Sequence, residues 1–250
     1  MTVTIVAELG SNWDPADPLN SSRQLIQAAA GAGANVVKMQ DWYPLDDMNR
    51  DDAWKERCKP WTLAPGAIPA LKWAAQKQHV EFLCSTFTIA AVTHAVQHRY
   101  PAIKIASSEI GNEELLTRLA RLRFPVWLST GGATYKDVER ALDWMGRVVR
   151  RHTTLLHCVC EYPTPVEHAA MRRVANLAKR FTMPVGWSSH ASYPDVVELA
   201  AEAVRAGATV IEAHFRVEGI TPESAPDNGP WALYPQEFGE LVGAVRDAER

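Results

Sequence analysis

Two histidines stand where apolar, β-branched runs end in the C-terminal third of the chain. His214 lies near the end of Ala208–Phe215, two residues after Glu212, and His190 follows the run at 184–188. Residues two apart on a strand point to the same face, so Glu212 and His214 share a face. Two strand-end histidines with a carboxylate beside one of them are more typical of a metal or catalytic site than of packing. The chain is therefore predicted to be an enzyme.

Polar side chains also gather where other apolar runs end. Lys38 and Gln40 share one face of a run, and Lys104 lies in the middle of another. A charge there is costly unless it faces a polar cavity, although each lysine has the simpler alternative of reaching solvent. A single hydroxyl usually caps a turn, but four hydroxyl pairs and two lysines at one rim predict a cradle for phosphate. The pairs are Ser85 and Thr86, Ser107 and Ser108, Ser129 and Thr130, and Ser188 and Ser189.

The elements that would position these residues alternate along the chain. A short β-branched run followed by a helical pattern occurs eight times, which is typical of βα units and a parallel sheet. Eight parallel strands can close on themselves, so we predict an α/β fold, a (β/α)8 TIM barrel forming a single domain over residues 1–250. The expected strands are 4–8, 35–40, 80–85, 102–106, 125–129, 154–160, 184–188 and 210–215. The expected helices are 21–31, 65–78, 89–99, 112–122, 135–149, 165–180, 193–206 and 235–248.

The joints that follow the expected strands are longer and more polar than those that precede them. This asymmetry places the site at the carboxyl ends of the strands. The longest joint, 41–64, contains Trp42, Tyr43, Trp54 and Trp61. A connection of that size predicts a segment that covers or binds a ligand.

Composition narrows the class of protein. The net charge of −3 and the scattered basic residues give no support to a nucleic-acid partner, so the substrate is expected to be a small molecule. No apolar stretch reaches about 18 residues and the N-terminus lacks a basic flank, so a cytoplasmic protein without membrane segments is expected. The four cysteines form no CxxC pair and are predicted to be buried thiols without disulfides.

At this point the sequence resembles the sialic acid (N-acetylneuraminate) synthases, which condense phosphoenolpyruvate with an aldose. Any one matching block is weak, but the ordered set spans nearly the whole chain. The block at 155–165, with its His-Cys-x-x-Glu-Tyr-Pro-Thr-Pro pattern, is the most specific. The blocks are AELGSN (7–12), VVKMQ (36–40), EFLCSTF (81–87), IKIASSE (103–109), LSTG (128–131), LLHCVCEYPTP (155–165), PVGWSSH (184–190) and VIEAHF (210–215).

The resemblance implies roles position by position. His190 and His214 match metal ligands, and Glu212 matches the acid that holds metal-bound water. Imidazole, carboxylate and water suit Mn²⁺, Zn²⁺ or Fe²⁺ better than Mg²⁺, and Mn²⁺ is the cofactor we expect. Groups matching the phosphoenolpyruvate site are Lys38, Thr86, Lys104, Ser107, Ser129 and Ser188. Groups matching the acceptor or metal-water side are Glu8, Gln40, Glu109, Tyr162 and Asp227, and Cys160 stands at a substrate-side position where the family has Asn or Ser. The implied catalytic set is Glu8, Lys38, Lys104, Glu109 and Glu212.

In the family's chemistry the metal polarises the open-chain sugar aldehyde, C3 of phosphoenolpyruvate attacks it, and water adds to C2 before phosphate leaves. The expected product is a 2-keto-3-deoxy sugar acid of the sialic or nonulosonic type. The resemblance also implies a homodimer.

Several departures leave the acceptor open. Asn12-Trp13-Asp14-Pro15 stands where the family reads Asn-His-x-Gly, and Ser189, Ala213 and Asn228 replace a usual Asp, Lys and His. The family's C-terminal antifreeze-like domain, which supplies an Arg to the partner subunit's sugar site, has no counterpart in these 250 residues. We therefore expect the segment 41–64 to shape a different acceptor pocket.

Three other functions remain open. A Schiff-base aldolase would use Lys104 or Lys38 as its nucleophile and would be indifferent to chelators. A metal-dependent hydrolase would keep the histidines but would not bind phosphoenolpyruvate. A catalytically inactive barrel would serve as a binding or assembly subunit, which a fold likeness by itself does not exclude.

Overall fold

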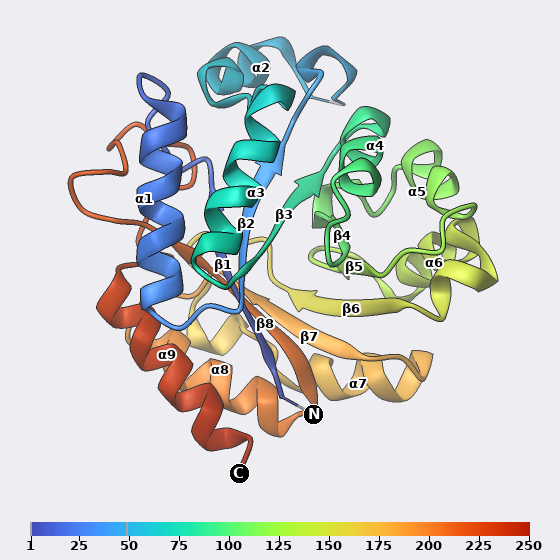
Figure 1. Ribbon diagram of the computed structural model, residues 1–250. Coiled ribbons are helices and arrows are strands. Elements are labelled where there is room, and N and C mark those ends of the chain that lie inside the picture. Colours follow the sequence, from blue (N-terminus) through green and yellow to red (C-terminus); the bar gives the residue numbers. More distant parts are fainter. Residues whose placement is uncertain (1, 49) are drawn as a thin grey trace.

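The computed structural model describes residues 2–48 and 50–250, so Asn49 of the predicted binding segment lies outside the described residues. Within them, nine parallel strands pair in chain order and β1 also pairs with β8. The first eight strands therefore close into a barrel, which helices surround (Figure 1). The predicted (β/α)8 fold is confirmed. The strands are β1 (Thr4–Gly10), β2 (Val36–Asp41), β3 (Glu81–Thr86), β4 (Ile103–Ile105), β5 (Val126–Ser129), β6 (Thr153–Cys158), β7 (Val185–Ser189), β8 (Ala208–Phe215) and β9 (Ala232–Leu233).

Helix ends follow local chemistry. The helix α6 starts at a capping box in which Thr134 and Asp137 each satisfy a backbone N–H of the other. The helix α1 ends at Ala32 because Gly33, with φ +96°, turns the chain back toward β2. The helices are α1 (Pro18–Gly31), α2 (Asp52–Cys58), α3 (Ile68–Lys77), α4 (Ile89–Gln97), α5 (Glu113–Leu119), α6 (Tyr135–Arg150), α7 (Arg172–Phe181), α8 (Asp195–Arg205) and α9 (Pro235–Ala248), and the 3₁₀ turns are η1 (Leu45–Asp47), η2 (Lys59–Trp61), η3 (Pro65–Ala67), η4 (Ser107–Glu109) and η5 (Val166–His168).

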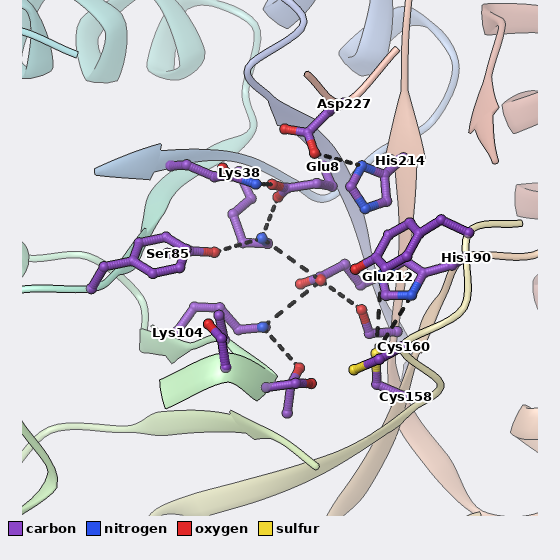
Figure 2. A pocket seen from close by; sticks show the side chains of 18 of the residues that line it. Glu8, Lys38, Ser85, Lys104, Cys158, Cys160, His190, Glu212, His214 and Asp227 are labelled. Carbon is purple, nitrogen blue, oxygen red and sulfur yellow. Dashed lines mark hydrogen bonds and ion pairs between the residues drawn. The ribbon is translucent and has the colours of Figure 1, made fainter. Parts of the chain in front are cut away.

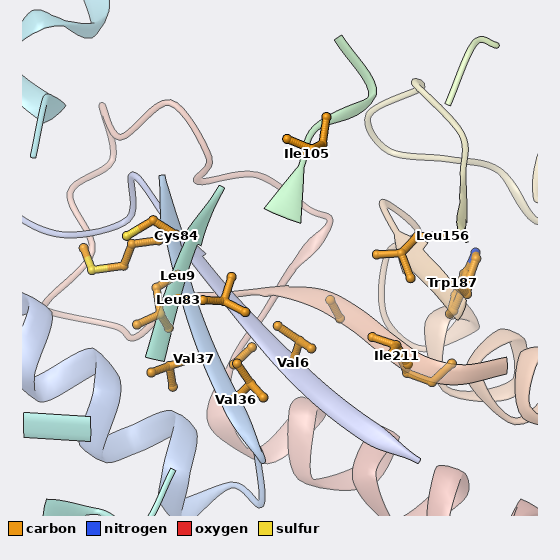
Figure 3. Close-up of a cluster of buried hydrophobic side chains, with 14 of the residues drawn as sticks. Val6, Leu9, Val36, Val37, Leu83, Cys84, Ile105, Leu156, Trp187 and Ile211 are labelled. Atoms are coloured by element: carbon orange, nitrogen blue, oxygen red, sulfur yellow. The ribbon is translucent and has the colours of Figure 1, made fainter. Parts of the chain in front are cut away.

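The barrel interior is layered. Its lower layers are apolar. Val6, Val36, Leu83 and Leu156 lie two residues before Glu8, Lys38, Ser85 and Cys158, so they share the inward face of their strands, and all four are buried (Figure 3). Such aliphatic layers fill the centre of a barrel rather than leaving a pore. The barrel therefore has a solid apolar base on which a polar end can be built.

Strand register builds that polar end. Glu8 is the register partner of Lys38 on one side and of His214 on the other. Further along the same layer, on the next two strands, Ser85 pairs with Lys104. Residues far apart in the sequence therefore meet in one layer near the carboxyl ends of the strands (Figure 2).

Some predicted boundaries are wrong. The strand expected over 154–160 ends at Cys158, and the helix expected over 165–180 begins only at Arg172. Prolines at 163 and 165 and the turn η5 occupy the intervening stretch, because proline lacks the N–H that a continuing helix needs. Neither β9 nor α2 was predicted.

The segment 41–64 is ordered by its aromatic residues. Trp42 and Trp54 pack edge to face with ring centroids 5.2 Å apart, and the indole of Trp61 donates to the Trp13 carbonyl at 3.1 Å. The helix α2, capped by Asp51, lies beyond the carboxyl end of β2 (Figure 1). The segment therefore stands at the end of the barrel where the polar layer lies.

None of the helices in residues 2–48 and 50–250 combines the length and the apolar character that a membrane crossing requires.

Candidate active site

A cavity of about 260 Å³ opens at the carboxyl ends of the barrel strands. Fifteen site residues were predicted from the sequence, and thirteen of them line this cavity. The role of each remains a prediction. Thr86 and Glu109 are absent from its wall: Thr86 donates to the Lys104 carbonyl at 3.1 Å, and Glu109 pairs with Arg50, which does line the cavity. The thirteen are Glu8, Lys38, Gln40, Lys104, Ser107, Ser129, Cys160, Tyr162, Ser188, His190, Glu212, His214 and Asp227.

Two lysines point into the cavity from opposite sides of one carboxylate. The Nζ of Lys38 contacts the Glu8 carboxylate and donates to Ser85 Oγ at 2.7 Å. The Nζ of Lys104 donates to Ser129 Oγ at 2.9 Å. Glu212 Oε1 lies 3.7 Å from the first ammonium and 3.9 Å from the second (Figure 2). Two cations with hydroxyl partners therefore face one buried space.

The two carboxylates of this layer have opposite protonation tendencies. Burial raises the pKa of Glu8 to about 8, against the attraction of Lys38. Burial also opposes ionisation of Glu212, but Lys104 and Lys38 outweigh it and lower the pKa to about 2. Near neutral pH one carboxyl therefore carries a proton and the other is ionised, which is the arrangement expected of an acid and a base.

The pKa values of the two lysines are also shifted in opposite directions. Burial lowers the pKa of Lys104. Burial also acts against the charge of Lys38, but the ionised Glu212 and the Glu8 carboxyl that accepts its hydrogen bond together raise its pKa. Lys38 is therefore the more firmly charged of the two.

Two imidazoles stand beside the lysines, with ring centroids 5.3 Å apart. His190 donates from Nδ1 to the Val159 carbonyl at 2.6 Å, which fixes the tautomer and leaves Nε2 with a lone pair. His214 Nδ1 is buried without a hydrogen bond and lies 4.0 Å from Asp227 Oδ1. Burial lowers the pKa of both imidazoles, that of His214 to about 4. Both rings are therefore neutral near pH 7.

These two rings fit a divalent metal ion. A ligand histidine commonly donates its other ring N–H to a carbonyl, as His190 does. Asp227 is held in place by Ser11, whose N–H and Oγ both donate to Oδ2 at 2.8 Å, so its Oδ1 faces His214. Among residues 2–48 and 50–250, no three His, Cys, Asp or Glu side chains form a ready-made ligand set. Water or substrate oxygens would therefore complete the coordination of an ion held by the two histidines.

Aromatic rings support this corner of the cavity. The Tyr162 ring stacks on His190 with centroids 3.8 Å apart. Trp231 packs edge to face on Tyr162 at 5.3 Å, and a side chain at Gly229 would collide with its indole. Sequence reasoning gave no role to Trp231, because only the folded β8–α9 connection brings it to this site.

The two cysteines near the end of β6 also line the cavity. Cys158 is buried and its Sγ lies 3.8 Å from His190 Nδ1, whereas Cys160 is exposed. The prediction that all four cysteines are buried is wrong for Cys160, because β6 ends two residues before it. A hydrogen bond from Cys160 lowers the pKa of the Cys158 thiol, and the same contact raises the pKa of Cys160.

Arg50 is a site residue that sequence reasoning missed. Its guanidinium lies 3.1 Å from Glu109 Oε1 and above the Trp54 ring at 5.7 Å. Glu109 also accepts hydrogen bonds from Ser108 and Asn112. The only sequence signal was the Trp-rich segment itself, whose Trp42 and Trp54 line the same cavity.

Comparison with known proteins identifies the family. The sequence model of the NeuB family matches residues 25–250. The chain belongs to the NeuB family. The resemblance to the sialic acid synthases is thereby confirmed, and the chain is an enzyme of this synthase type.

Individual NeuB relatives match along nearly the whole chain. The spore coat polysaccharide biosynthesis protein SpsE of Bacillus subtilis is 34% identical, over 99% of this chain and 68% of that protein. The N,N'-diacetyllegionaminic acid synthase of Campylobacter jejuni is 30% identical, over 98% of this chain and 76% of that protein. The crystal structure of the N-acetylneuraminic acid (sialic acid) synthetase from Leptospira borgpetersenii superimposes with a TM-score of 0.88 at 26% identity, over 99% of this chain and 84% of that one.

Proposed function

We propose that the chain condenses phosphoenolpyruvate with an aldose-like acceptor, giving a 2-keto-3-deoxy sugar acid and phosphate. One observation carries the proposal: Lys38 and Lys104, each with a hydroxyl partner, enclose a buried space directly beside two neutral imidazoles. Relatives named as synthases of legionaminic, pseudaminic and N-acetylneuraminic-type acids support the same reaction class.

The lysines would hold the anionic end of phosphoenolpyruvate. Phosphate and carboxylate oxygens accept charge-assisted hydrogen bonds from ammonium and hydroxyl groups. Ser85 and Ser129 already orient the two ammonium groups toward the cavity. Because the cavity is partly buried, these interactions are stronger than they would be in water and favour a fixed orientation of the substrate.

A divalent ion, for which we propose Mn²⁺, would be held by His190 and His214 with Asp227 close by. When bound, it would polarise the acceptor aldehyde. The free lone pair on His190 Nε2 and the unpaired Nδ1 of His214 support this assignment.

The two carboxyls would move the protons of the reaction. As C3 of phosphoenolpyruvate bonds to the aldehyde carbon, the aldehyde oxygen becomes a hydroxyl and takes a proton, which Glu8 carries near neutral pH. Water then adds to C2 and loses a proton to the ionised Glu212. The C2 centre finally expels phosphate, which takes up the proton of the C2 hydroxyl, and becomes the ketone of the product.

The acceptor would enter over the aromatic side of the cavity. Trp42, Trp54 and Tyr162 line this side of the cavity, and Arg50, paired with Glu109, offers a polar contact there. We propose an acetamido aldose as the acceptor class, since the synthases among the relatives are named for acylated amino sugar acids.

The test is acceptor-dependent release of phosphate. Purified protein is incubated with phosphoenolpyruvate, Mn²⁺ and single acetamido aldoses, including N-acetylmannosamine, with the parent aldoses as controls. Phosphate release that requires an acceptor, disappears with EDTA and yields a product with the mass of the acceptor plus pyruvic acid supports the proposal. If calorimetry detects no binding of phosphoenolpyruvate with or without Mn²⁺, the proposal fails and an inactive binding barrel becomes the better interpretation.

One observation favours the alternative of a Schiff-base aldolase. Burial lowers the pKa of Lys104, and a nucleophilic lysine needs a lowered pKa to be a neutral amine. Borohydride reduction in the presence of pyruvate separates the two mechanisms. The condensing enzyme gives no trapped adduct, whereas an aldolase gives a mass increase on Lys104 that persists in EDTA.

A further inference from the structure

Cys158 and Cys160 bring two thiols to the same wall of the cavity. Cys158 is the last residue of β6, and Cys160 follows it in the connection after the strand. One thiol is buried and the other exposed, yet both line the cavity. Figure 2 shows their sulfur atoms beside each other, next to His190.

The exposed thiol is held against its neighbour. The two thiols lie close enough to interact, and Ser107 lies beside both, with its Oγ accepting a hydrogen bond from the Gly131 N–H at 3.0 Å. A Cβ at Gly131 would lie 2.6 Å from Cys160 Sγ and 2.8 Å from Ser107 Oγ, so the glycine leaves the space that this sulfur fills. The dithiol is therefore a packed pair rather than two independent side chains.

The peptide between the two thiols also orients His190. The Val159 carbonyl accepts the hydrogen bond from His190 Nδ1 at 2.6 Å. Cys158 Sγ lies 3.8 Å from the same nitrogen. A change in the geometry of the dithiol would therefore move the group that fixes this imidazole.

We propose that Cys158 and Cys160 form an oxidation site, at which hydrogen peroxide converts the dithiol into an intramolecular disulfide. One sulfur, as thiolate, attacks a peroxide oxygen, the O–O bond breaks, and the hydroxide that leaves takes up the thiol proton as water. The second sulfur attacks the resulting sulfenic acid, the S–O bond breaks, and a second water leaves. Two thiols are thus oxidised by two electrons while one peroxide is reduced to two waters.

The other two cysteines do not share these features. Cys84 is fully buried and receives a hydrogen bond from Tyr100, and Cys58 is buried in α2. Neither lines the cavity. Oxidation should therefore be confined to the pair at the end of β6.

Closing the disulfide should disturb the site reversibly. An S–S bond of about 2.05 Å requires the sulfurs to approach each other well inside hydrogen-bonding distance. The intervening Val159 carbonyl must shift with them, and His190 loses its fixed orientation. Any ligand that depends on His190, with Mn²⁺ as the probe, should bind more weakly to the oxidised protein and normally again after reduction.

The experiment counts thiols. The protein is treated with hydrogen peroxide, quenched with catalase, unfolded and alkylated with iodoacetamide, and its intact mass is measured. Four alkyl groups are expected without peroxide and two after it, with four restored by dithiothreitol. Peptide mapping should place the disulfide between positions 158 and 160.

Two variants complete the design. Cys160→Ser should form no intramolecular disulfide, whereas Cys58→Ser should still lose two thiols to peroxide. A disulfide that involves Cys58 or Cys84, one that joins two chains, or full alkylation after peroxide would overturn the proposal. The thiol count does not depend on turnover, so failure of the proposed condensation reaction and failure of this oxidation site are distinguished.

Discussion

Ser188 and Glu212 are register partners on β7 and β8, and the Ser188 hydroxyl donates to Glu212 Oε1 at 2.8 Å. This bond holds the carboxylate where it faces both Lys38 and Lys104. Glu212 thus competes with an anionic substrate for the two ammonium groups, while serving as the base of the proposed reaction.

Glu212→Gln should therefore separate binding from turnover. Removing the negative charge leaves the lysines free for phosphoenolpyruvate, so its dissociation constant should stay the same or fall. Loss of the base should lower phosphate release by roughly 10²- to 10⁴-fold. Calorimetry and a phosphate assay measure the two effects, and thermal unfolding verifies the fold. Equal loss of binding and turnover would assign Glu212 to substrate binding alone.

The histidine pair predicts a metal affinity that depends on two side chains. His190→Ala and His214→Ala should each weaken Mn²⁺ binding by about 10²-fold or more, because each removes one of two nitrogen ligands. His152→Ala, at an exposed position outside the cavity, is the matched control. Calorimetric titration of EDTA-treated protein measures the affinities. Mn²⁺ binding that survives in both variants would place the ion elsewhere.

Much of this site follows from strand phase. Lys104 was predicted to face a polar cavity because a charge in mid-strand needs one, and it does so, with Ser129 as its partner. Glu212 and His214 were predicted to share a face from their spacing, and both line the cavity. A period of two residues is a local property, so these placements needed no tertiary information.

The residues and elements that were not predicted depend on contacts between distant parts of the chain. Arg50 meets Glu109 across 59 positions of chain, in a segment whose short helix α2 depends on packing of tryptophans. The two-residue strand β9 exists only because the end of β8 is available for pairing. Short elements have weak intrinsic preferences, so tertiary packing decides them.

Arg50 should affect the acceptor and not phosphoenolpyruvate. Arg50→Met removes the guanidinium beside Glu109, so the KM for the acceptor should rise by roughly tenfold, as expected for a lost charged hydrogen bond. The dissociation constant for phosphoenolpyruvate should not change, since the lysines lie deeper in the barrel. Arg57→Met on the exposed face of α2 is the control. A change confined to phosphoenolpyruvate binding would contradict this assignment.

Glu8 predicts a pH dependence of stability with a definite sign. Its pKa is about 8 in the folded chain against an ordinary value of 4.5, so between these pH values the folded state holds a proton that the unfolded state has lost. This contribution to the free energy of unfolding is complete below pH 4.5, decreases as the pH rises, and is gone above about pH 8.

The comparison of wild type with Glu8→Gln isolates this effect. In metal-free buffer, the wild-type melting temperature should fall relative to the variant between about pH 5 and pH 8. Glu81→Gln, at an exposed position of β3, should follow the wild type. A difference that grows with rising pH in favour of the wild type would mean that Glu8 is ionised in the folded protein.

Gly186 should not tolerate a side chain in the barrel wall. A Cβ there would lie 2.5 Å from the Val210 carbonyl oxygen and 2.5 Å from Leu156 Cδ2, at the point where the register of β7 and β8 shifts. A backbone carbonyl in a strand ladder cannot move aside, so Gly186→Ala should destabilise the protein by about 1–3 kcal/mol.

Gly243→Ala on α9 supplies the matched substitution. A Cβ at this position meets no atom within 4 Å, and alanine is the better helix former, so a gain of about 0.5–1 kcal/mol is expected. Urea unfolding of both variants measures the two free energies. A Gly186→Ala variant as stable as the wild type would contradict this prediction. It would mean that β7 and β8 can move apart at no cost, so that no rigid wall sets the spacing between Ser188 and Glu212.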